Sequence, residues 1–85
     1  MEFIAVAFRS REHTVRYAEF LRRNGVYCQI IGTPKEAGVG CGLSARLQVS
    51  DLGRAKKGVR ITAYDSFAGI FLVKTVGGRR VVKTI

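Results

Sequence analysis

The sequence predicts an α+β fold in which two helices pack on one sheet. Three observations carry this prediction: short stretches with apolar residues at every second position, two stretches with the 3.6-residue period of an amphipathic helix, and a Gly-Gly pair between two apolar runs near the C-terminus. The chain has 85 residues, so we expect a single domain over residues 1–85. With 47% apolar residues its core is small, and a homodimer is therefore among the assemblies that we consider.

The first strand and the first helix are predicted from the N-terminal quarter of the chain. The run Glu2–Phe8 is apolar almost throughout, which is typical of a strand covered on both faces, so we place it at the centre of the sheet. Ser10 stands where a helix N-cap belongs, and Asn24-Gly25 supplies a left-handed end. The helix between them is expected to bury one face, made of Thr14, Tyr17, Ala18 and Leu21.

Two strands joined by a long loop follow the first helix. The stretches Val26–Gly32 and Leu43–Val49 both alternate with period two, which predicts a hairpin. Cys28 points the same way as Val26 and Ile30 in this pattern, so we interpret it as a small buried hydrophobe. Three polar residues of the second strand are expected to face water: Ser44, Arg46 and Gln48.

A second helix is predicted from Asp51 to about Tyr64, with Ser50 as its N-cap. Its apolar residues recur on one side, and its Lys and Arg residues lie off that stripe. Gly53 and Gly58 weaken the prediction, since each costs about 1 kcal/mol relative to alanine in a helix interior. A shorter helix followed by an extra strand is therefore the alternative.

The C-terminal part of the chain is predicted to be a hairpin. Phe67–Val76 and Arg79–Ile85 flank Gly77-Gly78, a pair that favours a tight two-residue turn. This turn sets Val73 opposite Val82. The hairpin is thus apolar enough to complete the sheet.

These elements follow the order β-α-β-β-α-β with one added strand. This is the ferredoxin-like arrangement, a two-layer sandwich of one sheet and two helices. Right-handed crossovers would place both helices on the same face of the sheet. Residues 76–85 form the C-terminal hairpin extension that supplies the additional strand.

The chain is strongly basic, with 15 Lys and Arg residues against 6 Asp and Glu residues and a formal net charge of +9. Such a charge favours anionic partners. The charges are spread along the chain, and no stretch matches the basic-aromatic signature of RNA-binding strands. A nucleic-acid accessory function is therefore the weakest of our hypotheses.

Neither a membrane nor a secretory pathway is indicated by the pattern of apolar residues. The longest apolar runs fall far short of the ~20 residues of a membrane-spanning helix. The start of the chain shows neither the basic segment nor the cleavage site of a signal peptide. We expect a cytoplasmic protein with reduced cysteines and no membrane contact.

The loop Thr33–Gly42 concentrates the unusual residues of the chain. Cys41 lies between Gly40 and Gly42, so no neighbouring side chain shields its sulfur, and the amides of such a turn can converge on an anion. Lys35 and Arg46 add positive charge nearby in the sequence. One interpretation is a nucleophilic or sulfur-carrying thiolate. The other, which spacing alone favours, is a structural hairpin loop that happens to contain a cysteine.

Other chemistry finds less support in the residues. Two cysteines and His13 do not form a ligand set with metal-binding spacing, so we expect no metal site. His13 is also the single histidine, which makes a cysteine hydrolase with a positioned general base improbable. The glycines around Cys41 join two strands and do not open a helix, so they lack the context of a dinucleotide site. We expect a carrier or binding protein without a cofactor, not an enzyme.

Four stretches of the chain carry a family resemblance: Phe3–Phe8, Leu21–Val26, Gly32–Glu36 and Cys41–Arg46. The most specific part is the Thr33-Pro34 pair followed by Cys-Gly-Leu at the head of a strand. Together they resemble the small family described as selenium or sulfur carrier proteins. The resemblance runs from Glu2 to about Val73.

The resemblance implies that Cys41 is the family's motif cysteine, which holds sulfur or selenium as a persulfide or selenopersulfide between donor and acceptor enzymes. The alternative is a non-catalytic protein-interaction module, which could be dimeric and in which the loop is structural. The C-terminal hairpin and the high charge depart from the family pattern, and the Cys-Pro-x-Pro motif of carriers in tRNA thiolation is absent. The residues expected to accompany the carrier thiol are Pro34, Lys35, Gly40, Gly42 and Arg46.

Overall fold

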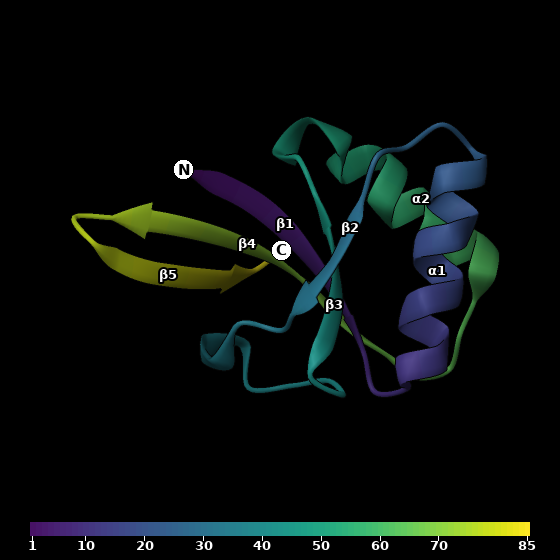
Figure 1. The fold of residues 1–85 in the computed structure, drawn as a ribbon, viewed down its shortest axis with the longest axis horizontal. Helices are drawn as coiled ribbons and strands as arrows, with labels where there is room; N and C mark the ends of the chain where they lie inside the picture. Colours follow the sequence, from purple (N-terminus) through teal and green to yellow (C-terminus); the bar gives the residue numbers. More distant parts are fainter.

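The computed structural model describes residues 1–85. Two helices lie on one side of a five-stranded antiparallel sheet, which confirms the predicted α+β class (Figure 1). Neither helix has the length and the apolar character that a bilayer crossing demands. The helices and strands are β1 (Glu2–Phe8), α1 (Arg11–Arg23), β2 (Gln29–Gly32), β3 (Leu43–Leu47), α2 (Leu52–Thr62), β4 (Phe67–Val76) and β5 (Arg79–Thr84).

The sheet has the strand order β2-β3-β1-β4-β5, so β1 is central as predicted. Its residues from Ile4 to Phe8 are fully buried, which explains why the strand is apolar on both faces. β4 and β5 form the predicted hairpin, and Val73 lies opposite Val82 in the observed register. The amide of Ile85 extends this pairing by donating to the carbonyl oxygen of Ile70 at 2.9 Å.

The core lies between the sheet and the two helices. Alternate residues of β1 face the helices, beginning with Ile4, and the face that α1 buries is the predicted one. Phe8 and Tyr17 pack ring against ring, with centroids 5.0 Å apart. The buried cluster comprises Ile4, Val6, Phe8, Tyr17, Ala18, Leu21, Val26, Cys28, Ala45, Leu47, Ala55 and Ile70.

The predicted N-cap of α1 is confirmed, whereas the predicted N-cap of α2 is wrong. The hydroxyl of Ser10 accepts the amide N–H of His13 at 3.1 Å, as expected of the N-cap of α1. Ser50, in contrast, is not an N-cap, because it lies inside a 3₁₀ turn, Val49–Asp51, after which α2 begins without a side-chain cap. α2 ends at Thr62, earlier than predicted. The next strand is β4, so the extra strand of the alternative prediction does not form.

The strand β2 begins three residues later than the predicted start at Val26. The guanidinium group of Arg22 donates two hydrogen bonds to the carbonyl oxygen of Cys28, at 3.2 and 3.1 Å, and so holds that carbonyl outside the strand ladder. The side chain of Cys28 is buried, with 2% of its surface exposed, as predicted. β3 likewise stops at Leu47, since the following residues turn into the 3₁₀ segment.

One residue predicted to face water is buried. Ser44 is fully covered, because the loop between β2 and β3 folds back over the face of the sheet opposite the helices. The Ser44 hydroxyl lies 2.7 Å from the hydroxyl of Thr33, which satisfies it in this covered position. A backbone atom of the same loop, the Cα of Gly40, sits close enough to β1 that a side chain there would touch Ala7.

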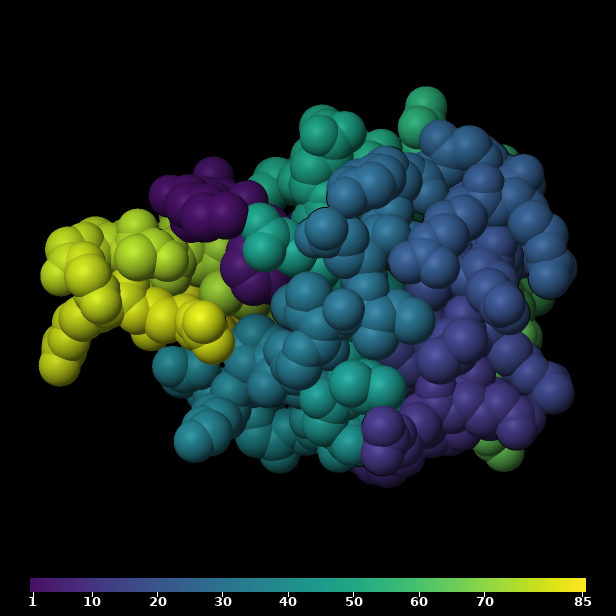
Figure 2. All heavy atoms as spheres, in the orientation of Figure 1, coloured from purple at the N-terminus to yellow at the C-terminus, as the bar shows by residue number.

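The β4–β5 hairpin projects from the body of the molecule and returns toward the loop. It forms the yellow end of the chain in Figures 1 and 2. β5 packs against the 3₁₀ turn Lys35–Ala37 within the loop, and the guanidinium group of Arg80 lies 3.9 Å from the carboxylate of Glu36. The hairpin therefore helps to hold the loop that contains Cys41.

The two helices approach each other closely at Gly58, which is buried in α2. A Cβ atom at this position would lie 3.1 Å from Leu21 and 3.3 Å from Tyr17. Tyr17 cannot easily move away, because its hydroxyl donates to the carbonyl oxygen of Ala55 at 2.8 Å. A Cβ atom at Gly53 in the same helix would meet no neighbouring atom within 4 Å, so the two glycines have different roles.

We predict that Gly53→Ala and Gly58→Ala change the free energy of unfolding in opposite directions. Gly53→Ala should raise it by about 0.5–1 kcal/mol, because alanine favours the helix and meets no neighbour. Gly58→Ala should lower it by about 1 kcal/mol, because overpacking against Leu21 and Tyr17 exceeds the helix gain. Urea unfolding of both variants measures the difference, and equal stabilisation would contradict the close packing of the helices.

We predict a loss of stability at alkaline pH that depends on Tyr17. Burial, with a smaller effect from Cys28, raises the pKa of Tyr17, so above the ordinary value of 10.0 the unfolded chain loses a proton that the folded chain keeps. The free energy of unfolding should then fall by up to about 1.4 kcal/mol per pH unit.

The variant Tyr17→Phe should show a weaker decline above pH ~10. It should also lose about 1 kcal/mol near neutral pH, because the hydrogen bond to Ala55 is gone. Tyr27→Phe is the matched control, since Tyr27 is 72% exposed and its loss should leave the pH profile unchanged. Urea unfolding at a series of pH values measures both profiles, and identical slopes in the two variants would contradict the assignment to Tyr17.

Candidate functional site

Cys41 is held at the end of the central strand by its own backbone. Its amide donates to the carbonyl oxygen of Phe8 at 2.9 Å, which ties the loop to β1. Gly40 and Gly42 on either side have φ values of +93° and +96°, a conformation that favours glycine. A Cβ atom at Gly40 would also lie 3.2 Å from the carbonyl oxygen of Phe8. The flanking glycines are therefore required by the path of the loop.

The sulfur of Cys41 is half-buried against the first turns of α1. Sγ lies 3.8 Å from the hydroxyl oxygen of Thr14 and 3.8 Å from the carbonyl oxygen of Leu43. Thr14 is fully buried, and its hydroxyl donates to the carbonyl oxygen of Ser10 at 3.1 Å. The thiol thus contacts the N-terminal end of a helix, in a residue that is only partly buried.

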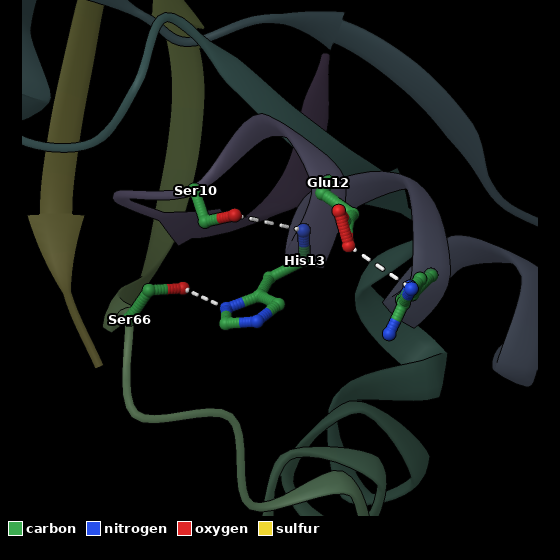
Figure 3. A network of polar contacts seen from close by, with 5 residues as sticks. Ser10, Glu12, His13 and Ser66 are labelled. Carbon is green, nitrogen blue, oxygen red and sulfur yellow. Dashed lines mark hydrogen bonds and ion pairs between the residues drawn. The ribbon is translucent and has the colours of Figure 1, made fainter.

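A second polar contact joins the same end of α1 to the segment before β4. The ring nitrogen Nδ1 of His13 lies 2.6 Å from the hydroxyl of Ser66 (Figure 3), and the imidazole ring stacks on Tyr64 with centroids 4.4 Å apart. The backbone N–H of His13 is bonded to Ser10. The loop of Cys41 and the segment Tyr64–Ser66 therefore both contact the first turn of α1.

Sequence reasoning missed these contacts because they join residues far apart in the chain. Thr14 was expected only as part of the buried face of α1, and no contact was predicted for His13. Ser66 lies 53 positions from its partner His13. One signal was present for Thr14, since it is the single polar side chain on an otherwise apolar helix face.

Four of the predicted site residues line one pocket in the loop, although Cys41 itself is not among its lining residues. The loop forms a shallow, open pocket of about 260 Å³ that Pro34, Lys35, Gly40 and Gly42 help to line. Pro34 is buried and precedes the 3₁₀ turn, whereas Lys35 is exposed at its start. The amides of Gly40 and Gly42 have no hydrogen-bond partner within the chain, so they remain available as donors.

Arg46 lies apart from this pocket. Its guanidinium carbon is 4.2 Å from the ring centroid of Phe3, near the opposite end of β1 from Phe8. Arg46 pairs with Ala5 in the sheet, three residues from the point where Cys41 is attached, which corresponds to about 10 Å along the strand. The structure therefore brings the four other predicted site residues together at one pocket and separates Arg46 from them.

Cys28 is far more buried than Cys41. Its sulfur lies within the core and donates to the carbonyl oxygen of Ala18 at 3.4 Å. Burial raises the pKa of Cys28, and the nearby guanidinium group of Arg22 opposes this only in part. Both cysteines are free thiols, and no group of three metal-binding side chains occurs. Cys41 is thus the thiol that a reaction partner can reach.

The fold and this thiol define a class: a small α+β domain that presents one half-exposed cysteine on a glycine-flanked loop. The chain belongs to the family described as "Putative Se/S carrier protein-like", whose model matches residues 4–60. This confirms the resemblance found in the sequence, and the matched range contains Cys41 and its loop. The description indicates a carrier of selenium or sulfur, which works with partner proteins.

The match ends within α2, before the position near Val73 to which the resemblance was expected to extend. The strands β4 and β5 therefore lie outside the matched range. Neither the search of curated proteins nor the search of solved structures finds a match to the chain.

We predict that the two thiols react with a disulfide reagent at very different rates. In the native protein Cys41 should react at least about tenfold faster than Cys28, because Cys28 becomes accessible only when the core opens. Absorbance of the released thiolate measures both phases. Cys41→Ser should remove the fast phase, and Cys28→Ala is the matched control that should keep it. A fast phase that persists in Cys41→Ser would contradict the assignment.

Proposed function

We propose that Cys41 carries sulfur or selenium as a persulfide or selenopersulfide between a donor protein and an acceptor protein. The observation that carries this proposal is the half-exposed thiol of Cys41 on a loop within the matched range of a carrier family. The second thiol, Cys28, is buried and has a raised pKa, so it is unsuited to the same role.

The transfer proceeds by exchange at sulfur. The thiolate of Cys41 attacks the outer sulfur of a donor persulfide, a new S–S bond forms at Cys41, and the S–S bond of the donor breaks. The donor leaves as a thiolate and takes up the proton that Cys41 gave up. An acceptor nucleophile then attacks the outer sulfur, and Cys41 leaves in turn as a thiolate. No external oxidant or reductant is consumed, and outer selenium is transferred by the same step.

The loop residues support this chemistry in different ways. Gly40 and Gly42 place no side chains of their own beside Cys41, and their unpaired amides are donors for the terminal sulfur anion. Lys35 contributes positive charge at the rim of the pocket, and the buried ring of Pro34 fixes the start of the 3₁₀ turn. Arg46, held over Phe3, contributes only to the general positive field.

We also infer that the domain is ferredoxin-like. The first four strands follow the order β2-β3-β1-β4, with a helix after β1 and another after β3, and β5 adds to the edge of β4. Exchange at a free thiol requires a reducing environment, so we place the carrier in the cytoplasm. These inferences agree with free, unpaired cysteines at both positions.

The proposal is tested by loading the protein from a low-molecular-weight cysteine persulfide. We predict that the intact protein gains the mass of one sulfur atom and that peptide mapping places this atom on Cys41. Cyanide should then remove the outer sulfur as thiocyanate and restore the original mass. Cys41→Ser should gain no sulfur, whereas Cys28→Ala should load normally.

The contribution of the loop charge has its own matched pair of variants. Lys35→Gln should slow loading by about threefold, while Lys83→Gln, which removes the same charge from β5, should leave the rate unchanged.

Sulfur found on Cys28, or native protein that takes up none, would overturn the carrier function. Unchanged binding of partner proteins by Cys41→Ser in that case would favour the interaction module.

A further inference from the structure

A groove separate from the thiol lies between the second half of α1 and the outer side of α2. Its volume is about 260 Å³, and its floor is apolar. Ile61 at its edge is 57% exposed, so its side chain is available for contact with a partner. The residues that matter for the argument are Phe20, Leu21, Val26 and Ile61 on the floor and Arg54 and Lys57 on the rim.

The rim of the groove is positively charged and lacks acidic side chains. α2 carries Arg54, Lys56, Lys57 and Arg60 and contains no Asp or Glu. Arg54 has a partner in Asp51 at 3.5 Å, but none of the ion pairs of the protein involves the other cations of α2. The groove therefore combines the exposed side chain of Ile61 with the unpaired positive charge of Lys57.

We propose that this groove binds an acidic amphipathic helix of a partner protein. Apolar side chains of such a helix would pack against Ile61 and Phe20, and its carboxylates would face Lys57 and Arg54. The volume lies below the ~300–1,000 Å³ of most small-molecule pockets, so it suits one or two protruding side chains better than a whole ligand.

A nucleic acid fits these observations less well. Single-stranded nucleic acids combine phosphate contacts with stacking of bases on aromatic side chains. The groove offers one aromatic residue, Phe20, among aliphatic ones, and bases would leave the aliphatic floor unmatched. Carboxylates next to apolar side chains match both features of the groove at once.

The groove leaves the thiol free. Thr14, which contacts the sulfur of Cys41, precedes Phe20 by six residues of α1, which corresponds to about 9 Å along the helix axis. A partner seated on the groove therefore need not cover the loop. This inference does not rest on the carrier function, although a docking site at this distance would suit a donor or an acceptor.

The experiment measures binding of a fluorescein-labelled peptide by fluorescence anisotropy, in the full chain and in Cys41→Ser. The peptide has about four helical turns, with Leu at helical spacing and Glu elsewhere. We expect it to bind at least about tenfold more tightly than a scrambled peptide of the same composition. The Cys41→Ser protein should bind it equally well, which separates this result from that of the sulfur-loading experiment.

Two variants locate the binding on the groove. Ile61→Ser should weaken binding about fivefold, and Lys57→Gln about threefold, whereas Lys83→Gln on β5 is the matched charge control and should have little effect. Circular dichroism checks that each variant is folded. Equal binding of the scrambled peptide, equal loss in Lys57→Gln and Lys83→Gln, or displacement of the peptide by a single-stranded RNA at lower concentration would overturn the proposal.

Discussion

The burial of β1 on both of its faces is the constraint on which the rest of the structure depends. The helices cover one face, and the loop after β2 folds over the end of the other, where the amide of Cys41 bonds to the carbonyl oxygen of Phe8. A buried strand end needs partners for its carbonyl groups, and the loop provides one. The position of the thiol is thus a consequence of how the central strand satisfies its backbone.

This arrangement explains why two cysteines in one small domain have different chemistry. Cys28 comes from a segment that packs beneath α1, where its sulfur replaces an apolar side chain in the core. Cys41 comes from a loop whose backbone is bonded but whose side chain remains partly open. The contrast follows from the topology of the sheet, and it supports the proposal that exchange at sulfur takes place at Cys41.

The sequence predicted the parts of the fold that depend on local patterns. The apolar run of β1, the Ser10 cap and the Gly77-Gly78 turn each identify their element because the physical cause lies within a few residues. The burial of Ser44 could not be predicted in this way, since it depends on a loop that folds back from elsewhere. Alternation alone assigns a face of a strand and does not show what covers that face.

The same limit applies to the site. The glycines beside Cys41 were identified from their neighbours in the sequence, and their positive φ values agree with that interpretation. Arg46 was expected near the thiol because it follows shortly in the chain, but strand geometry carries it about 10 Å away, over the ring of Phe3. The contact between Thr14 and Cys41 required knowledge of how α1 crosses the sheet.

The last strand of the chain gives the thiol loop an additional attachment from outside the family-matched range. The pair between Arg80 and Glu36 is solvent-exposed and long, at 3.9 Å, so it stabilises the contact by at most about 1 kcal/mol and weakens as ionic strength rises. Substitution of Arg80 can therefore alter how tightly the loop is tethered while every atom around the sulfur stays the same. In this protein the edge strand β5 thus helps to fix the position of the loop that carries the sulfur of Cys41.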